Sequence, residues 1–579
     1  MTSRFIYLPS DPNREVDEAC WKGLMTTFPR DDMLRIQYLA GGLLKDSYAW
    51  ILQNPEYKKW VKSEINLLRI TGDSGKGKTM LLCGIIDELM GSSTGLRNIS
   101  YFFCQATDAR LNNATAVLRG VILMLLRDQT SLISHIRARY YEIGMYLFDD
   151  SHAWRELSTI LKSMLKDPTL EKTSIIIDGL DECIVDFGLL VHLIAQLSRT
   201  QPHVKWIVSS RDGLTIEDTL ESVTRQRTIR LDLNEACVTN AIEVFIKHKL
   251  HQLFQENEYD DKLRSEVSSL FSKGSKNNFL WVELVWKQLM RAPRWKALST
   301  LKSSPSELTV LYIRMMERIG FSEDSSLFKA ILAIASTVFR PIKLPELVSF
   351  LDALKKFSDD TESLRDIIGY CAPFLTVRDN TLLFVHHSAQ DVLLNVIPGQ
   401  VFQAGIKIQH NLIFSKSLEN MSKILRRNMY DLSEIVVEYV NTPSRDPLAP
   451  VRYSCLYWVD HLIAGYSKTQ ATSKEWHDDL QAVHNFLSEK FLYWVEALSL
   501  MGQLFEGLVI MQKLSDFIKG ETWEHVLSEF VGAGCRFIDH CLSSGKIYPP
   551  RIYSSALSWS RNEGSARIMF KEGDQMDED

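Results

Sequence analysis

A glycine-rich segment in the first part of the chain constrains its fold more than any other feature. Residues Gly72–Thr79 read Gly-Asp-Ser-Gly-Lys-Gly-Lys-Thr, a complete G-x-x-x-x-G-K-[ST] phosphate-binding loop. The apolar run Ile65–Ile70 predicts a strand that enters the loop. Met80–Leu89 predicts the helix that leaves it, with the positive end of its dipole at the loop. A strand, this loop and a helix in succession predict an α/β domain that binds a polyphosphate.

The residue types in the loop suit a nucleotide with Mg²⁺. Glycine lets the backbone turn closely, so that successive N–H groups point at phosphate oxygens. Lys78 can reach the β- and γ-phosphates, and Thr79 can ligate Mg²⁺ through its hydroxyl. The predicted nucleotide-binding residues are Gly72, Asp73, Ser74, Gly75, Lys76, Gly77, Lys78, Thr79 and the following Met80.

Composition excludes several other classes of protein. The 579 residues are 45% hydrophobic and 24% charged, which is ordinary for a globular chain of roughly three or four domains. A net charge of −6 gives no overall attraction to nucleic acid or to an anionic membrane. No apolar run is long enough to span a bilayer, and the first residues lack a signal-peptide pattern. We expect a cytoplasmic protein with no nucleic-acid or membrane partner.

The nine cysteines give a further indication of the compartment. No pair has CxxC spacing, and several lie inside apolar patterns. We therefore expect buried thiols in a reducing environment, with neither a disulfide framework nor a zinc site.

Four further strand-like runs follow the loop and alternate with helical patterns. They are Ile99–Phe103, Ser174–Ile177, Val204–Val208 and Thr228–Leu233. Strands that alternate with helices predict a parallel sheet covered by helices on both faces. After Leu233 the pattern is helical, apart from short strand signals near Thr376–Arg378 and Leu382–Val385.

An acidic segment follows the run Ser174–Ile177. It reads Asp-Gly-Leu-Asp-Glu-Cys and begins at Asp178. A buried parallel strand delivers Asp178 to the carboxyl edge of the sheet, where the phosphate loop also lies, so we expect Asp178 to bind Mg²⁺ directly or through water. A helix cap or turn is the common alternative for a strand-end aspartate. Asp181 or Glu182 can position or activate an attacking water, and the sequence does not choose between them.

An arginine follows the next strand-like run. Val204–Val208 leads into Ser-Ser-Arg-Asp, and Arg211 at this tip can contact a γ-phosphate and report its loss. The alternative is a surface arginine paired with an acid, which contributes little. The candidate catalytic residues are therefore Asp181, Glu182 and Arg211, and the candidate Mg²⁺ ligands are Thr79 and Asp178.

Together these motifs resemble the NACHT family of signalling NTPases, within the STAND class. The form most similar is that of fungal NACHT proteins related to heterokaryon-incompatibility factors. The similar segments are Gly72–Thr79, Tyr101–Asp108, Ile175–Cys183, Val204–Arg211, Phe279–Val282 and Tyr453–Leu462. They extend the resemblance over most of the chain.

The resemblance implies an order of domains. A short N-terminal region and a nucleotide-binding α/β domain are followed by a helical domain, a winged helix and a second helical domain, and an acidic, disordered tail ends the chain. The corresponding ranges are 1–60, 61–233, 234–304, 305–400, 401–565 and 566–579. Linkers are indicated at Ser303–Ser306 and Asn441–Pro447.

The resemblance also implies a histidine lock. In the family, a winged-helix histidine contacts the β-phosphate of a bound diphosphate and holds an inactive form. The matching stretch is Phe384–Asp391, whose spacing favours His386 and makes His387 the second candidate.

The chain departs from the family pattern in two respects. Related proteins often carry a proline in the first helical domain that packs on the base, and Asn277–Phe279 occupies that place here. The choice between adenine and guanine therefore stays open. The family usually continues into sensor repeats such as WD40 or ankyrin, and often begins with an effector domain. We therefore expect either a minimal switch or part of a longer protein.

The function implied is a nucleotide-dependent signalling switch. It would bind ATP/ADP or GTP/GDP with Mg²⁺, exchange closed and homo-oligomeric states, hydrolyse the triphosphate slowly, and act with protein partners in fungal immunity or incompatibility signalling. One alternative is a helical scaffold that nucleotide only stabilises. Another is a P-loop kinase, but no arginine-rich lid or acceptor pocket is evident near the loop.

Overall fold

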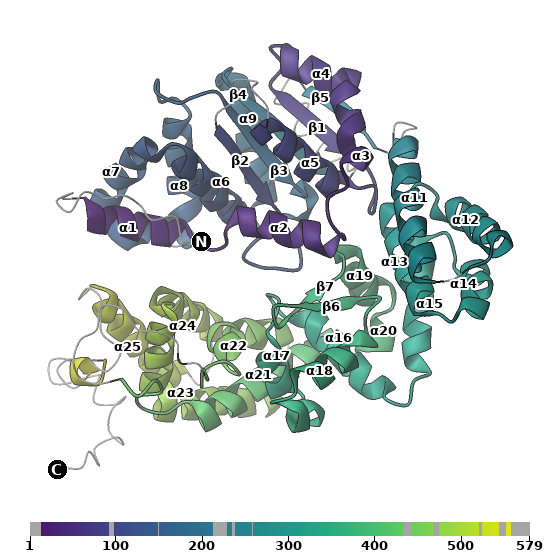
Figure 1. The fold of residues 1–579 in the computed structure, drawn as a ribbon. Helices are drawn as coiled ribbons and strands as arrows, with labels where there is room; N and C mark the ends of the chain where they lie inside the picture. Colours follow the sequence, from purple (N-terminus) through teal and green to yellow (C-terminus); the bar gives the residue numbers. More distant parts are fainter. Residues whose placement is uncertain are drawn as a thin grey trace. The chain divides into compact units, whose positions relative to one another are not determined.

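The computed structural model describes most of the chain. The described residues are 13–91, 98–148, 150–211, 228–233, 238–257, 259–432, 443, 445–466, 474–519, 524–543 and 552–556. Asn441, Thr442 and Ser444 of the predicted linker Asn441–Pro447 and all of the predicted acidic tail 566–579 lie outside them. The chain divides into two compact units, Met1–Arg314 and Met315–Asp579, and each is considered by itself (Figure 1).

The first unit is built on a five-stranded parallel sheet with the strand order β2-β3-β4-β1-β5 (Figure 1). The strands are β1 (Leu67–Thr71), β2 (Asn98–Phe103), β3 (Thr173–Asp178), β4 (Val204–Ser210) and β5 (Thr228–Asp232). The predicted α/β fold class is confirmed, and each predicted strand ends within two residues of the observed one. Because β4 lies between β1 and β3, its tip separates the phosphate loop from the acidic segment.

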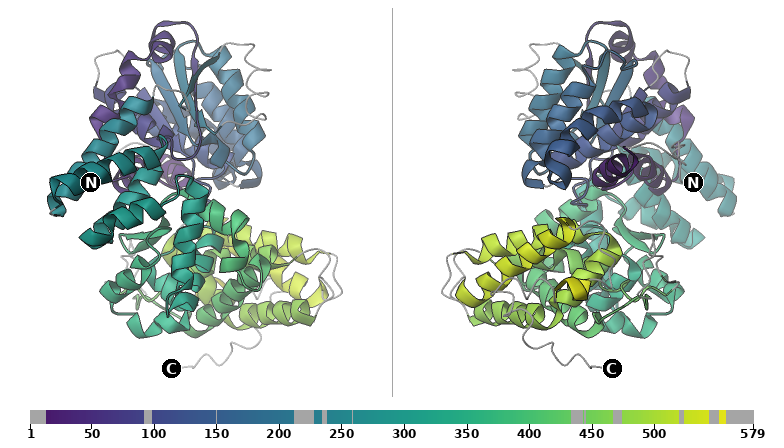
Figure 2. Two further views of the ribbon diagram at one scale, coloured as in Figure 1. Left: turned by 90° about the vertical axis from the view of Figure 1, so that its right-hand side faces the viewer. Right: turned by 90° about the vertical axis from the view of Figure 1, so that its left-hand side faces the viewer.

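Side chains of the strands alternate between two hydrophobic cores. Ile175 and Ile177 of β3 belong to one core and Ile176 to the other, because successive strand residues point to opposite faces. Helices cover both faces (Figure 2). The first core packs against α1 (Arg14–Leu24), α6 (Ala114–Asp128), α7 (Ile133–Ile143), α8 (Asp150–Met164) and α9 (Phe187–Thr200). The second packs against α2 (Pro29–Leu39), α3 (Lys45–Tyr48), η1 (Ala49–Gln53), α4 (Pro55–Lys62) and α5 (Lys78–Gly91).

The N-terminal helices are part of this α/β body. Trp21 and Leu24 of α1 enter one core, and Trp60 of α4 enters the other. The Trp60 indole N–H donates to the Asn66 carbonyl at 3.2 Å. The helices of residues 14–62, which include most of the predicted short N-terminal region 1–60, thus pack against both faces of the sheet.

Helices make up the rest of the first unit. They are α11 (Thr239–Glu256), α12 (Asp261–Ser275), α13 (Phe279–Arg291), α14 (Ala297–Ser303) and the start of α15 (Leu308–Gly320). A buried ion pair at 2.7 Å joins Lys249 of α11 to Glu283 of α13, and the Lys249 ammonium lies 4.1 Å from the centre of the Trp286 ring. Pairing and ring contact compensate the cost of burying the lysine charge.

The second unit begins with a winged-helix arrangement. Its helices are α16 (Ser325–Thr337), α17 (Leu344–Phe350) and α18 (Thr361–Gly369), and its wing is the antiparallel hairpin of β6 (Leu375–Arg378) and β7 (Thr381–Phe384). An antiparallel bridge between Lys343 and Thr381 adds a minimal third strand. The hairpin coincides with the two short strand signals predicted after Leu233. It leads into α19 (His387–Asp391), η8 (Val392–Val396) and α20 (Pro398–Val401).

A second helical group follows, as the resemblance implies. It contains α21 (Ile406–Ile424), α22 (Arg452–Gly465), α23 (Lys474–Met501), α24 (Leu504–Ile518) and α25 (Glu524–Ser543). Aromatic side chains such as Trp458, Phe491 and Trp494 are buried in its core. The Trp494 indole N–H donates to the Cys455 carbonyl at 3.0 Å. These aromatic residues therefore form the core of the helical group.

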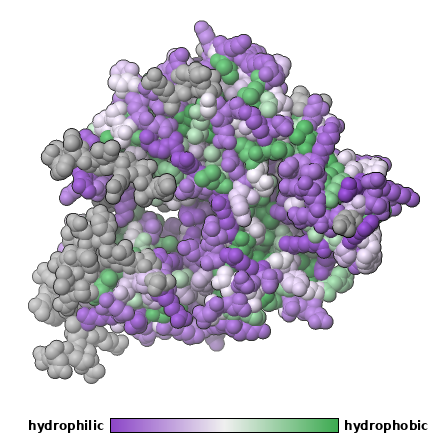
Figure 3. Space-filling view, viewed as in Figure 1, coloured by the Kyte–Doolittle hydropathy of each residue, from purple (hydrophilic) through white to green (hydrophobic). Residues whose placement is uncertain are grey.

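Most of the described cysteines lie in the interior. Eight of the nine cysteines lie among the described residues, all as free thiols, and seven of them are buried. None of the described helices is long and apolar enough to cross a membrane. Hydrophilic residues predominate on the face drawn in Figure 3.

Candidate nucleotide-binding site

The phosphate loop joins the end of β1 at Thr71 to the start of α5 at Lys78. Gly75 and Gly77 have left-handed φ values of 79° and 82°. A Cβ atom at Gly75 would lie 2.3 Å from the Asn278 Oδ1, and one at Gly77 would lie 3.1 Å from the Phe279 Cδ2. Both the backbone conformation and these close approaches require glycine. The predicted strand, loop and helix are therefore all present.

Lys78 lies over the loop, close to the acidic segment. Its Nζ donates to the carbonyls of Gly72 at 2.5 Å and Asp73 at 3.0 Å. Burial lowers the pKa of Lys78, while attraction to Asp181 and Asp178 opposes that shift. The ammonium thus contacts the loop backbone and is attracted by two carboxylates, and it can exchange its carbonyl partners for phosphate oxygens.

Asp178 ends β3 and is 4% exposed. The Ser209 Oγ donates to the Asp178 Oδ1 at 2.5 Å and accepts from the Gly179 N–H at 2.8 Å. Burial raises the pKa of Asp178, and hydrogen bonds from the side chains of Ser209 and Thr79 counteract the shift. The hydrogen bond from the Thr79 side chain to Asp178 brings together the two predicted metal ligands.

The donors at this point fit Mg²⁺. This cation takes oxygen ligands and usually binds one or two protein groups, completing its shell with water and phosphates. The Thr79 hydroxyl and the Asp178 carboxylate are such a pair. Among the described residues, no group of three or more His, Cys, Asp or Glu side chains forms a separate metal site.

Asp181 and Arg211 form an ion pair at the tips of neighbouring strands. The Arg211 main-chain N–H donates to the Asp181 Oδ1 at 3.0 Å, and its Nε lies 3.1 Å from the Oδ2. Their side chains are 20% (Asp181) and 39% (Arg211) exposed. The sequence offered two interpretations of Arg211, a γ-phosphate contact and a surface arginine paired with an acid. The pairing is observed, and at this edge it does not exclude the phosphate contact.

Glu182 turns toward the segment that follows β2. Its Oε2 accepts a hydrogen bond from the Ala106 N–H at 3.1 Å. Burial raises the pKa of Glu182 to about 8. The two acids therefore differ in environment. Asp181 forms an ion pair with Arg211, whereas the raised pKa of Glu182 keeps its carboxyl group largely protonated at neutral pH. A carboxyl group with a raised pKa is also suited to proton transfer, so both stay candidates for the catalytic acid.

His386 lies in the second unit, at the start of α19. Its Nδ1 accepts from the Ser388 N–H at 3.2 Å and lies 2.9 Å from the Ser388 Oγ. An Nδ1 that accepts a main-chain hydrogen bond carries no proton, so the neutral ring holds its proton on Nε2. The His387 ring is 4.1 Å away, centre to centre. The predicted contact between His386 and a bound phosphate stays a prediction.

Sequence reasoning missed two polar residues of the site, Ser209 and Asn278. Ser209 orients Asp178, as described above. Asn278 caps α13, where its Oδ1 accepts from the Trp281 N–H at 2.9 Å, and its Nδ2 donates to the Ser74 carbonyl at 2.9 Å. The available signal was an asparagine just before a helical pattern. The resemblance assigns this position only to a base-packing proline.

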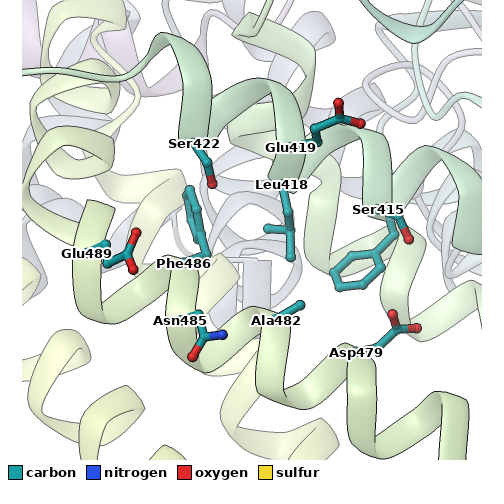
Figure 4. A pocket seen from close by; sticks show the side chains of 10 residues that line it. Ser415, Leu418, Glu419, Ser422, Asp479, Ala482, Asn485, Phe486 and Glu489 are labelled. Carbon is teal, nitrogen blue, oxygen red and sulfur yellow. The ribbon is translucent and has the colours of Figure 1, made fainter.

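A separate pocket of about 290 Å³ lies between α21 and α23 (Figure 4). Phe414, Leu418 and Phe486 give it apolar walls, and carboxylates of Glu419, Asp479 and Glu489 surround it. Glu419 pairs with Lys416 and Lys423, and Asp479 accepts from the Tyr466 hydroxyl at 2.5 Å. Carboxylates repel phosphate, so this pocket does not suit a nucleotide.

Fold and site together define an α/β P-loop NTPase fold with attached helical domains. A family model described as "Nephrocystin 3, N-terminal" matches residues 46–211. The chain is 41% identical, over 576 residues, to "Vegetative incompatibility protein HET-E-1" of Podospora anserina. That match covers 96% of this chain and 42% of the relative, so the chain spans less than half of the relative's length. These matches confirm the resemblance to fungal NACHT proteins that the motifs predict.

Two solved structures are distantly similar to the chain. The Walker-type ATPase PABY2304 of Pyrococcus abyssi is 12% identical with a TM-score of 0.30, over 61% of this chain and 95% of that one. The ORC1 protein of Aeropyrum pernix in complex with DNA is 13% identical with a TM-score of 0.28, over 65% and 96%. Likenesses this distant carry no argument about what the present chain binds.

Proposed function

We propose that the chain is a nucleotide-dependent switch of the STAND type, which binds ATP/ADP or GTP/GDP with Mg²⁺ at the phosphate loop. The observation that supports it is the meeting of complementary groups at one edge of the sheet. Lys78 and Thr79 begin α5, Asp178 ends β3, and Arg211 with its partner Asp181 lies beside them. Cations, a hydroxyl and a buried carboxylate are the groups that a nucleotide–Mg²⁺ complex requires.

The residues at this edge of the sheet would have different roles in binding the nucleotide. Lys78 would exchange its carbonyl partners for β- and γ-phosphate oxygens, and main-chain N–H groups of the loop would hold the same phosphates. Thr79 and Asp178 would ligate Mg²⁺, whose charge neutralises the phosphates when it is bound. Ser209 would keep the Asp178 carboxylate in place through the 2.5 Å hydrogen bond.

Arg211 would distinguish triphosphate from diphosphate. Its guanidinium is paired with Asp181, and a γ-phosphate offers a competing anionic partner. A diphosphate lacks that group, so the Arg211–Asp181 pair would persist. A ligand can shift an equilibrium only through different affinities for the two states, and a shift from 1:99 to 99:1 requires about 5.5 kcal/mol. The partner exchange of Arg211 is one source of such a difference.

His386 would supply the opposing contact. Its Nε2–H can donate to the β-phosphate of a diphosphate and favour a closed form. Exchange for triphosphate would release this lock and allow chains to assemble. Slow hydrolysis, with Asp181 or Glu182 positioning the water, would limit the lifetime of the assembled state. The name of the Podospora anserina relative supports a role in incompatibility-type signalling.

The experiment that tests nucleotide binding is a fluorescent-nucleotide titration of purified chain with Mg²⁺. Lys78→Ala should abolish binding. Lys58→Ala is the matched control, because Lys58 lies on α4, outside the loop and the acidic segment, and its Nζ donates to the Gln53 Oε1 at 2.5 Å. Unchanged affinity in Lys78→Ala would contradict the proposal. Binding that changes neither the assembly nor the triphosphate over time would favour a nucleotide-stabilised scaffold.

A further inference from the structure

We infer that Asn278 is a positioning residue for the phosphate loop and couples the loop to α12 and α13. The inference deepens the function proposed above, because it rests on nucleotide binding at Gly72–Thr79. Asn277 and Asn278, which lie between α12 and α13, and Phe279, the first residue of α13, are here called the Asn278 clamp.

The clamp meets a requirement that any phosphate loop creates. When successive N–H groups of a loop converge on an anion, the carbonyls of the same peptide groups point outward. A carbonyl shielded from water needs a donor, or it costs free energy. The Asn278 Nδ2 donates to the Ser74 carbonyl at 2.9 Å, and the Phe279 N–H donates to the Gly75 carbonyl at 2.8 Å. Two consecutive loop carbonyls thus have their donors on one connection.

Glycine at position 75 supports the same conclusion. Gly75 occupies one of the unspecified positions of G-x-x-x-x-G-K-[ST], so phosphate binding alone does not call for glycine there. Its φ is +79°, and a Cβ would lie 2.3 Å from the Asn278 Oδ1. The close approach of Asn278 therefore accounts for a glycine that the motif leaves unexplained.

Two more contacts complete the clamp. The Lys76 Nζ donates to the Asn277 carbonyl at 3.1 Å. The Phe279 ring lies against Gly77, where an added Cβ would approach the ring to 3.1 Å. Lys276 and Asn277 adopt left-handed φ values of 42° and 56°, which turn the chain sharply between the helices. Successive loop residues from Ser74 to Gly77 thus each touch the clamp.

The double role of Asn278 provides the coupling. Its Oδ1 accepts from the Trp281 N–H and caps α13, while its Nδ2 donates to the Ser74 carbonyl of the loop. A movement of α12 and α13 relative to the sheet must either carry the loop with it or break these hydrogen bonds. A bound nucleotide that requires the clamped loop would therefore favour the clamped position of α13. By reciprocity, a change in the position of α13 would change the nucleotide affinity.

The test compares Asn278→Ser with Asn113→Ser. Asn113 is a close match, because its Oδ1 caps α6 through the Ala116 N–H at 2.8 Å and its Nδ2 donates to the Ala109 carbonyl at 2.8 Å. Serine keeps an N-cap oxygen in both variants and adds no charge, but removes the amide donor. Hydrogen exchange of the peptide that covers Ser74–Gly77, measured without nucleotide, should be about three- to tenfold faster in Asn278→Ser than in wild type or Asn113→Ser.

Nucleotide affinity is the second readout. Asn278→Ser should raise the Kd for diphosphate with Mg²⁺ about three- to tenfold, and Asn113→Ser should leave it unchanged. Equal exchange and equal Kd in the two variants would overturn the clamp. If wild-type chain binds no nucleotide, the proposed function fails, and the exchange comparison still decides whether Asn278 holds the loop.

Discussion

Asp181 binds Arg211 through both the main chain and the side chain. One carboxylate oxygen accepts from the Arg211 N–H at 3.0 Å, and the other lies 3.1 Å from the guanidinium Nε. The pair joins the segment after β3 to the tip of β4, the strand that lies next to the strand of the phosphate loop. The cation expected to detect a γ-phosphate therefore already has an anionic partner, with which a phosphate must compete.

Arg211→Ala should weaken triphosphate binding about fivefold or more and leave diphosphate binding unchanged, because a hydrogen bond between charged groups is lost only with the γ-phosphate. Competition titrations with both nucleotides measure this. Asp181→Asn keeps an acceptor for the Arg211 N–H but removes the competing charge, so triphosphate affinity should rise. Equal losses for both nucleotides in Arg211→Ala would show that Arg211 does not sense the γ-phosphate.

Ser209 and Ser210 offer a paired test of the hydrogen bond to Asp178. Both are fully buried on β4, but the Ser209 Oγ bonds Asp178 and Gly179, whereas the Ser210 Oγ has no hydrogen-bond partner among the described residues. Ser209→Ala should lower the free energy of unfolding by about 1–3 kcal/mol, and Ser210→Ala should change it little. Urea denaturation followed by tryptophan fluorescence distinguishes them. Similar losses would mean that packing, not the hydrogen bond, sets the cost.

The raised pKa of Glu182 predicts a specific pH dependence of the stability of the folded chain. Its pKa is raised from 4.5 to about 8 in the folded chain, so the folded state binds its proton more tightly than the unfolded state. The stability from this group is fully present below about pH 4.5 and is lost as the pH rises toward 8. Glu182→Gln stays neutral and can still accept from the Ala106 N–H. The melting temperature of Glu182→Gln should therefore increase relative to that of the wild type as the pH rises from 5 to 8. A constant difference over that range would contradict the raised pKa.

His386→Ala should accelerate release of bound diphosphate and have less effect on triphosphate, because the proposed lock touches the β-phosphate of the closed form. His387→Ala is the neighbouring control, since its ring lies 4.1 Å from that of His386. Stopped-flow release of a fluorescent diphosphate measures both variants. If His387→Ala has the larger effect, the second candidate is the lock; if neither changes release, the lock assignment fails.

Local patterns were sufficient to predict much of this fold. Short buried strands such as Ser174–Ile177 contain an apolar run that is followed by polar residues, which is enough to predict the parallel sheet and its carboxyl edge. The same logic placed Asp178 beside Thr79, more than ninety residues earlier in the chain, and the structure brings the two together. Asp178 ends a strand and Thr79 ends the phosphate-loop motif, and a single sequence reveals both features.

Contacts that depend on distant elements were not predictable in this way. Asn278 is 204 residues from Ser74, and only the packing of α13 against the loop puts its amide beside that carbonyl. The helices α1 and α4 are polar in composition because each buries only one side, as at Trp21 and Trp60, so their packing on the sheet was not predicted. Whether Asp181 or Glu182 faced Arg211 depended on the turn at Gly179, whose left-handed conformation the sequence only permits.

The most direct test of the account is the mass of the chain in solution with each nucleotide. Wild-type chain should stay monomeric with diphosphate and Mg²⁺ and form a larger assembly with a non-hydrolysable triphosphate, as measured by light scattering after size-exclusion chromatography. Lys78→Ala should show one mass in both conditions. An identical wild-type mass with either nucleotide, at concentrations that saturate binding, would contradict the switch.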